Sequence, residues 1–178
     1  MLLLVAAWSL AEAILLVVVV DVPISWIAVR RGWRPALFAS MVAAAAASAG
    51  GAVTFAWAAA DPAGAAGAIA ALPGIDPAMI ERTASRFAKD GYTAMLVGSL
   101  TGIPYKLFAL AAAEHGRSVL PFVLISAVAR LPRFLLVAAA AAGLSRILAP
   151  RLGTRARLAL LAGCWLLFYT CYFAVMPA

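Results

Sequence analysis

Long apolar runs dominate this chain, and short polar stretches separate them. A helix that crosses a bilayer needs about 20 consecutive, mostly apolar residues. Three runs reach this length without a single acidic residue: 35–60, 118–147 and 158–176. The pattern predicts three transmembrane helices, and Gly50 and Gly51 in the first would allow another helix to approach closely.

Two further apolar segments, residues 1–30 and 92–116, are interrupted near their middles. The interrupting residues are acidic or helix-breaking: Glu12, Asp21, Pro23, Gly102 and Pro104. Proline and glycine disfavour a continuous helix. Each segment is therefore expected to turn back on itself as a helical hairpin, with Pro23 at the first tip and with Gly102 and Pro104 at the second.

The polar region between the first span and the second hairpin contains two kinds of sequence. Residues 61–75 carry the turn signals DPAG and LPG, which predict a loop. Residues 76–90 have apolar side chains on one helical face, with Asp76 suited to the N-cap, Pro77 to the first turn and Gly91 to the C-terminal cap. We expect an amphipathic helix in the plane of the membrane interface, with a soluble connecting helix as the alternative.

The charge distribution sets the expected topology. Arginines cluster in residues 30–34 and 146–157, and the positive-inside rule places both clusters in the cytoplasm. The acid-containing loop 61–91 then lies outside. Both clusters can be inside only if the two interrupted segments enter the membrane and return, from opposite faces. The expected fold is an all-α, multi-pass membrane domain over residues 1–178, with two opposed re-entrant hairpins, about three transmembrane helices and an inverted repeat.

Composition narrows the class of protein further. The 178 residues are 66% hydrophobic and 12% charged, whereas a soluble domain is near half apolar and a quarter charged. The formal net charge is +7, but the arginines lie at the ends of apolar runs, so the charge indicates topology and not a nucleic-acid partner. Cys164 and Cys171 are seven residues apart on one helix and are too distant to form a disulfide.

Five ionisable residues lie within the apolar segments: Glu12, Asp21, Lys106, Arg130 and Arg133. A charge at the centre of a membrane helix costs about 2.5–3.5 kcal/mol on insertion scales, so such residues suggest a functional site. Arg130 and Arg133 are three apart and share a helical face. The two acids could neutralise two of the bases, and purely structural pairing is one interpretation.

The other interpretation is a binding site for an anionic headgroup. Arginine offers a planar fork of donors and lysine a compact charge, so Lys106, Arg130 and Arg133 suit a phosphate. A buried carboxylate near these bases, Glu12 or Asp21, would be suited to carry a proton. The residues in this pattern match neither a metal site nor a cofactor motif.

The sequence also resembles a known family. Residues 101–113 read TGIPYKLFALAAA and residues 119–139 read VLPFVLISAVARLPRFLLVAA. These runs resemble the DedA superfamily, also called the SNARE-associated Golgi protein or VTT-domain family, and its YqaA-like branch most of all. The family's first hairpin has a Glu followed by an acid, which Glu12 and Asp21 match. The chain departs from the family pattern at Val17–Val20, which replaces a Pro-x-Pro, and at Ser99, where an arginine is usual.

The resemblance implies a lipid transporter of the bacterial inner membrane. Members of this family are linked to the movement of undecaprenyl phosphate or phospholipids between leaflets, in some cases with protons as coupling ions. In this reading Tyr105 and Lys106, at the tip of the second hairpin, meet the lipid headgroup together with Arg130 and Arg133.

Three alternatives remain open from the sequence. Ser99 and His115 would be the residues of an intramembrane hydrolase, although Ser99 is more typical of a hydroxyl that packs or hydrogen-bonds within a helix bundle and His115 of a residue at the membrane interface. A structural assembly protein of the cell envelope is the second. The third is the oligomeric state, since the chain could act alone or as a homo-oligomer.

Overall fold

The computed structural model describes residues 1–175, which form α-helices and no strand. The helices, in chain order, are α1 Leu2–Ile14, α2 Asp21–Arg31, α3 Trp33–Ala60, α4 Pro62–Ala70, α5 Pro77–Asp90, α6 Tyr92–Thr101, α7 Tyr105–Glu114, α8 Val119–Leu148 and α9 Thr154–Val175. Three of them, α3, α8 and α9, are long and apolar enough to cross a membrane. The chain is thus an all-helical, multi-pass membrane protein, and residue 176 of the predicted last span lies outside the described residues.

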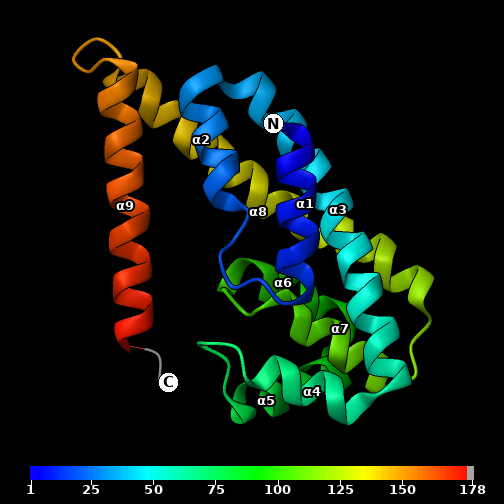
Figure 1. Cartoon of the computed structure of the whole chain (residues 1–178). Helices are drawn as coiled ribbons and strands as arrows, with labels where there is room; N and C mark the ends of the chain where they lie inside the picture. Colours follow the sequence, from blue (N-terminus) through cyan, green and yellow to red (C-terminus); the bar gives the residue numbers. More distant parts are fainter. Residues whose placement is uncertain (176–178) are drawn as a thin grey trace.

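Each interrupted segment forms a helix, a short break and a second helix, and each is followed by a long helix. The first unit is α1, the break at residues 15–20, and α2, followed by α3. The second is α6, the break at residues 102–104, and α7, followed by α8. Figure 1 shows α1 and α2 beside the upper parts of the long helices, with α6 and α7 lower down.

The two breaks have different physical causes. In the second, Gly102 adopts a φ of 88°, which favours glycine, and Pro104 precedes the first turn of α7. In the first, Pro23 does not form the tip, contrary to the sequence-based prediction. It lies in the first turn of α2, where its missing N–H removes no intrahelical bond. The break at residues 15–20 instead falls within a run of Leu and Val.

The core is formed where α3 contacts α1, α7 and α8. Small residues make this contact close, as predicted for Gly50 and Gly51. A Cβ atom at Gly50 would meet the backbone of Leu10, and one at Gly51 would overlap the Tyr105 phenol. The hydroxyl of Thr54 donates to the carbonyl of Ala13 at 2.9 Å and ties α3 to α1.

The loop predicted for residues 61–75 is wrong for residues 62–70, which form the helix α4, and holds for the residues after Ala70. Asp61 caps this helix by accepting a hydrogen bond from the Gly64 amide at 2.9 Å, and Pro62 fits its first turn. The turn signal DPAG is therefore also a helix start signal. The bounds and caps predicted for the next helix are confirmed, since the Asp76 side chain caps α5, Pro77 begins it and Gly91 ends it.

Proline inside α8 does not interrupt the helix, which runs continuously through Pro132. The Ser99 hydroxyl of α6 donates to the carbonyl of Ala129, one turn earlier, at 2.7 Å. Because a proline frees the carbonyl four residues earlier, which is that of Val128, the Ser99 bond is an additional contact and does not replace the lost one. Ser99 thus helps to hold α6 against α8 near the proline.

The last helix, α9, differs from the other spans because none of its residues is buried. It packs along α2 and lies at the side of the bundle (Figure 1). Two side-chain hydrogen bonds attach its middle: the Trp165 indole donates to the Ser25 hydroxyl at 3.0 Å, and the Val19 amide donates to the Tyr169 hydroxyl at 2.8 Å.

Candidate functional site

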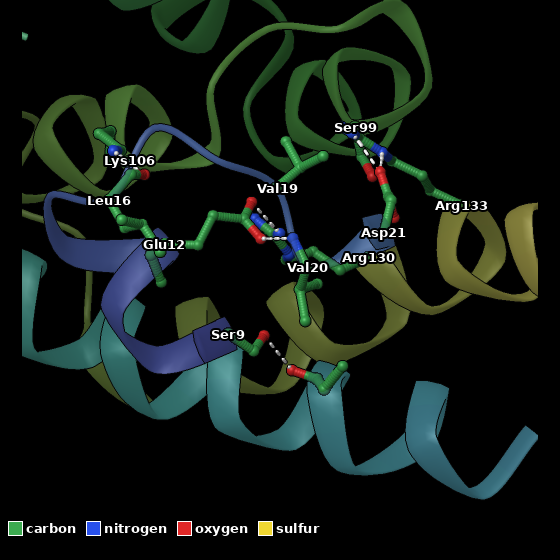
Figure 2. A network of polar contacts seen from close by, with 12 residues as sticks. Ser9, Glu12, Leu16, Val19, Val20, Asp21, Ser99, Lys106, Arg130 and Arg133 are labelled. Atoms are coloured by element: carbon green, nitrogen blue, oxygen red, sulfur yellow. Dashed lines mark hydrogen bonds and ion pairs between the residues drawn. The ribbon is translucent and has the colours of Figure 1, made fainter. Parts of the chain in front are cut away.

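A buried ion pair joins α1 to α8 at the centre of the fold. Nη2 of Arg130 lies 2.6 Å from Oε1 of Glu12, and both side chains are almost fully buried. The other carboxylate oxygen, Oε2, accepts a hydrogen bond from the amide of Val20 at 3.0 Å (Figure 2). Glu12 therefore also holds the end of the break between α1 and α2, which would otherwise leave a buried amide without a partner.

A second ion pair joins α2 to α8 one helical turn away. Nε of Arg133 donates to Oδ2 of Asp21 at 2.9 Å, and Nη2 contacts the same oxygen (Figure 2). The Asp21 side chain is buried, whereas 29% of the Arg133 side chain is exposed. Oδ1 of Asp21 is buried without a hydrogen-bond partner within the described structure.

Of the three cations in the apolar segments, Lys106 is the one that forms no ion pair within the described residues. It is only 4% exposed, and its Nζ donates to the carbonyl of Leu16 in the break of the first unit, at 3.0 Å. This bond brings the two breaks together (Figure 2). A backbone carbonyl carries only a partial charge, so it would not neutralise a protonated Lys106, whose ammonium would have two further N–H donors.

Aromatic rings cover the faces of the Arg130 guanidinium. Its carbon lies 4.7 Å from the Tyr105 ring centre and 5.0 Å from that of Phe134. The Tyr105 hydroxyl donates to the Ser126 hydroxyl on α8 at 2.6 Å, which fixes the ring. Cation–π contacts of this kind stabilise a desolvated guanidinium, so the site can keep Arg130 charged and in one orientation.

These groups surround a cavity of about 220 Å³. Glu12, Lys106, Arg130 and Arg133 line it, and so do the backbone of both breaks and apolar side chains from α6 and α7. Asp21 is not among the lining residues and contacts the cavity only through Arg133. Three cations and two carboxylates leave a net charge of one positive unit at a largely apolar cavity.

The structure thus brings together most of the residues predicted for the site. Of the predicted headgroup residues, Tyr105, Lys106, Arg130 and Arg133 all line the cavity. Gly102 and Pro104 line it as well. Pro23 does not, because it is buried inside the first turn of α2.

Sequence analysis missed one wall of the cavity. Phe168, Tyr169 and Tyr172 of α9 line it, together with Pro73 and Ile75 from the loop before α5. The aromatic residues lie on one face of α9 at helical spacing, which is the signal that could have indicated a wall. Nothing in the sequence of the loop indicates that it reaches the same cavity, because that contact depends on tertiary packing.

The residues of the hydrolase alternative serve structural contacts. The Ser99 hydroxyl donates to a carbonyl of α8, as described above, and Nδ1 of His115 lies 2.8 Å from the carbonyl of Ala111 in its own helix. The His115 ring packs against Phe87 of α5. Within residues 1–175, no group of three or more His, Cys, Asp or Glu side chains is placed to hold a metal ion.

The cysteines are both free and exposed on α9, which agrees with the prediction that they cannot pair with each other.

Comparison of the whole chain with protein-family models, with curated proteins and with solved structures finds no significant match.

Proposed function

We propose that this protein is a DedA-like lipid transporter of the bacterial inner membrane. It would move an anionic lipid, either a polyprenyl phosphate such as undecaprenyl phosphate or a phospholipid, between the two leaflets. In this proposal α1–α2 and α6–α7 are re-entrant hairpins that enter the membrane from opposite faces and meet at the cavity. The headgroup occupies the cavity while the acyl or prenyl chains stay in the surrounding lipid.

The observation that carries the proposal is the position of Lys106, a buried lysine at the cavity that has no ion-pair partner within the described residues. A lone buried ammonium in an apolar protein costs free energy unless an anion accompanies it. Glu12 and Asp21 are already matched one to one with Arg130 and Arg133. The missing negative charge is then best supplied by a bound headgroup, whose phosphate oxygens would accept the free N–H groups of Lys106.

In this proposal, protons are the coupling ions. Protonation of Glu12 or Asp21 removes a negative charge and leaves its arginine without an ionic partner. That arginine could then bind the phosphate by its planar fork, in addition to Lys106. Headgroup binding and carboxylate protonation would therefore favour each other, and departure of the lipid would restore the ion pair.

A purely structural role, as an assembly protein of the envelope, is the second candidate. The observation that favours it is the existing pairing of both arginines, which alone could hold α1 and α2 against α8. This role gives Lys106 no task beyond its bond to the Leu16 carbonyl. The two functions therefore make opposite predictions for a change that removes only the Lys106 charge.

The test is leaflet exchange in proteoliposomes with the variant Lys106→Gln. Glutamine keeps an N–H donor for the Leu16 carbonyl but has no charge. We expect exchange of labelled undecaprenyl phosphate, or of an anionic phospholipid, to fall by about 10- to 100-fold, as when a charged hydrogen bond to a ligand is lost. Thermal stability should change little.

The matched control is Lys89→Gln, which removes an equal charge at an exposed position of α5. It should leave exchange within about twofold of the unmodified protein, because an exposed charge is screened by water and salt. Unchanged exchange in Lys106→Gln, or no exchange of either lipid by the unmodified protein, would contradict the transport proposal and favour the structural role.

A further inference from the structure

A second hollow lies at the opposite end of α2 from the cavity just described. Its volume is about 700 Å³, and the C-terminal ends of α2 and α8 and the N-terminal end of α9 form it. Three cationic side chains line it: Arg30, Arg146 and Arg157. The 11 residues of α2 place its two ends about 15 Å apart along the helix axis, so this hollow is a distinct site.

No carboxylate balances these arginines. No Asp or Glu lines the hollow, and the sequence contains none in residues 22–60 or 115–178, which include all three helix ends that form it. None of the three arginines forms an ion pair within residues 1–175. The positive-inside rule explains why arginines lie at this end of the helices, but it does not require them to line the same hollow.

Arg157 is held in place before any ligand arrives. Its Nη1 donates to the Ser145 carbonyl at 3.0 Å and to the Ser145 hydroxyl at 2.6 Å, and its Nη2 donates to the Thr154 hydroxyl at 3.0 Å. These bonds satisfy a carbonyl in the last turn of α8. Nε of Arg157 is buried and has no acceptor within the described structure, so the guanidinium retains unused donor capacity.

Arg30 and Arg146 differ from Arg157 because their side chains are exposed and free to adapt to a ligand. A fixed guanidinium with two mobile ones provides a planar donor group and two adjustable charges. Phosphate oxygens are the acceptors that such a set binds best, since each guanidinium can donate two parallel hydrogen bonds.

The surroundings of the hollow favour a lipid as the source of the phosphate. Leu144 and Ile147 beside it on α8, and Leu160 on α9, are 51% to 73% exposed, so they offer apolar surface to acyl chains. Trp33 lines the hollow itself, and tryptophan favours the level of the headgroups in a bilayer. Basic pockets between membrane helices are known binding places for anionic headgroups.

We propose that this hollow binds the phosphate headgroup of an anionic phospholipid and thereby joins α9 to α2 and α8. It is a site separate from the transport cavity, and it does not depend on the proposed transport function. Because α9 has no buried residue, a headgroup that contacts Arg30 of α2, Arg146 of α8 and Arg157 of α9 adds cohesion where the protein alone provides little.

The experiment uses the full chain, delipidated in a neutral detergent, with phosphatidylglycerol as the probe and phosphatidylcholine as the zwitterionic comparison. Bound lipid is counted by native mass spectrometry, and the melting temperature is followed across the same titration. We expect phosphatidylglycerol, and not phosphatidylcholine, to be retained and to raise the melting temperature.

The variants Arg30→Gln and Arg146→Gln test the site, because both side chains are exposed and the lipid-free fold does not depend on them. Each should weaken phosphatidylglycerol binding by on the order of tenfold. The matched controls Arg151→Gln and Arg155→Gln remove the same charge from the same arginine-rich end but do not line the hollow. They should weaken binding by less than about twofold.

Three results would overturn the proposal. Equal weakening by the control and site variants would mean diffuse attraction between a basic surface and anionic lipid. Equal retention of phosphatidylcholine would mean that the phosphate charge is not recognised in preference to a zwitterion. Stabilisation by inorganic phosphate at the same concentrations as by phosphatidylglycerol would mean that a soluble anion, and not a lipid, is the ligand.

Discussion

Removal of the Arg130 side chain gives the sharpest measure of how the buried charges support the fold. In Arg130→Leu, the carboxylate of Glu12 keeps its bond from the Val20 amide but loses its cation 2.6 Å away. Both partners of the pair are almost fully buried, so water cannot replace the guanidinium. Breaking such a pair on one side costs about 3–5 kcal/mol, which is a factor of about 160 to about 5,000 in the unfolding equilibrium.

The magnitude can be compared with that of the neighbouring pair. In Arg133→Leu the carboxylate that remains, Asp21, is itself buried, but the lost Arg133 side chain is 29% exposed, so water can enter the space it leaves and solvate the carboxylate. We expect the smaller loss in this variant, about 1–3 kcal/mol. Arg130→Leu also removes the guanidinium that lies against Tyr105 and Phe134, which adds a packing loss.

A double-mutant cycle separates the charge effect from the packing effect. Glu12→Gln combined with Arg130→Leu leaves no buried charge, so the double variant should be more stable than the sum of the single losses predicts, by at least about 1 kcal/mol. The free energy of unfolding is measured in mixed micelles with a graded denaturing detergent. Additive losses in the cycle, or an Arg130→Leu variant as stable as Arg133→Leu, would refute the view that the pair is a desolvated unit.

Two further predictions concern packing and topology. Gly51→Ala should destabilise the protein by about 1–3 kcal/mol because the new Cβ overlaps the Tyr105 phenol. The control Gly67→Ala has open space around it and should be neutral or stabilising by up to about 1 kcal/mol. Thermal unfolding of both variants measures the difference, and equal effects would contradict the close contact at Gly51. In a background without native cysteines, a membrane-impermeant maleimide should label Ala63→Cys in intact cells and Arg155→Cys only after permeabilisation. Labelling of Arg155→Cys in intact cells, with Ala63→Cys labelled only after permeabilisation, would contradict the expected topology.

The sequence was most informative where the physical signal is local. Asp76, Pro77 and Gly91 define the bounds of α5 through capping chemistry that depends on few neighbours. The gathering of Glu12 and Arg130, 118 positions apart, could also be expected, because buried charges in apolar segments need partners. Which acid pairs with which arginine was not predictable, since both arginines share one face of α8.

Sequence analysis failed where a signal has two meanings or where the outcome depends on packing. The Pro near Asp61 marks a turn or a helix start, and the cap bond to Gly64 decides for the helix. Pro23 likewise marks a break or a first turn, and Glu12 resolves the ambiguity by holding the Val20 amide just before α2 begins. The role of α9 as a cavity wall was hidden because an aromatic face is equally typical of a membrane interface.

The exposed position of α9 sets an energetic order among the walls of the cavity that Lys106 and Arg130 line. The walls formed by α1, α7 and α8 belong to the buried core, and moving them would open voids in close-packed apolar contacts. Beside the cavity, α9 is attached through the bonds of Tyr169 and Trp165, each contributing about 0.5–1.5 kcal/mol net. The bonds of Arg157 to Ser145 of α8 lie at the N-terminal end of α9, away from this wall. Lipid tails are as apolar as leucine, so surface that α9 uncovers gains tail contacts in exchange. The route of lowest work into the cavity is therefore sideways, toward the bilayer, and under the proposed transport function a headgroup would take it without its chains leaving the hydrocarbon.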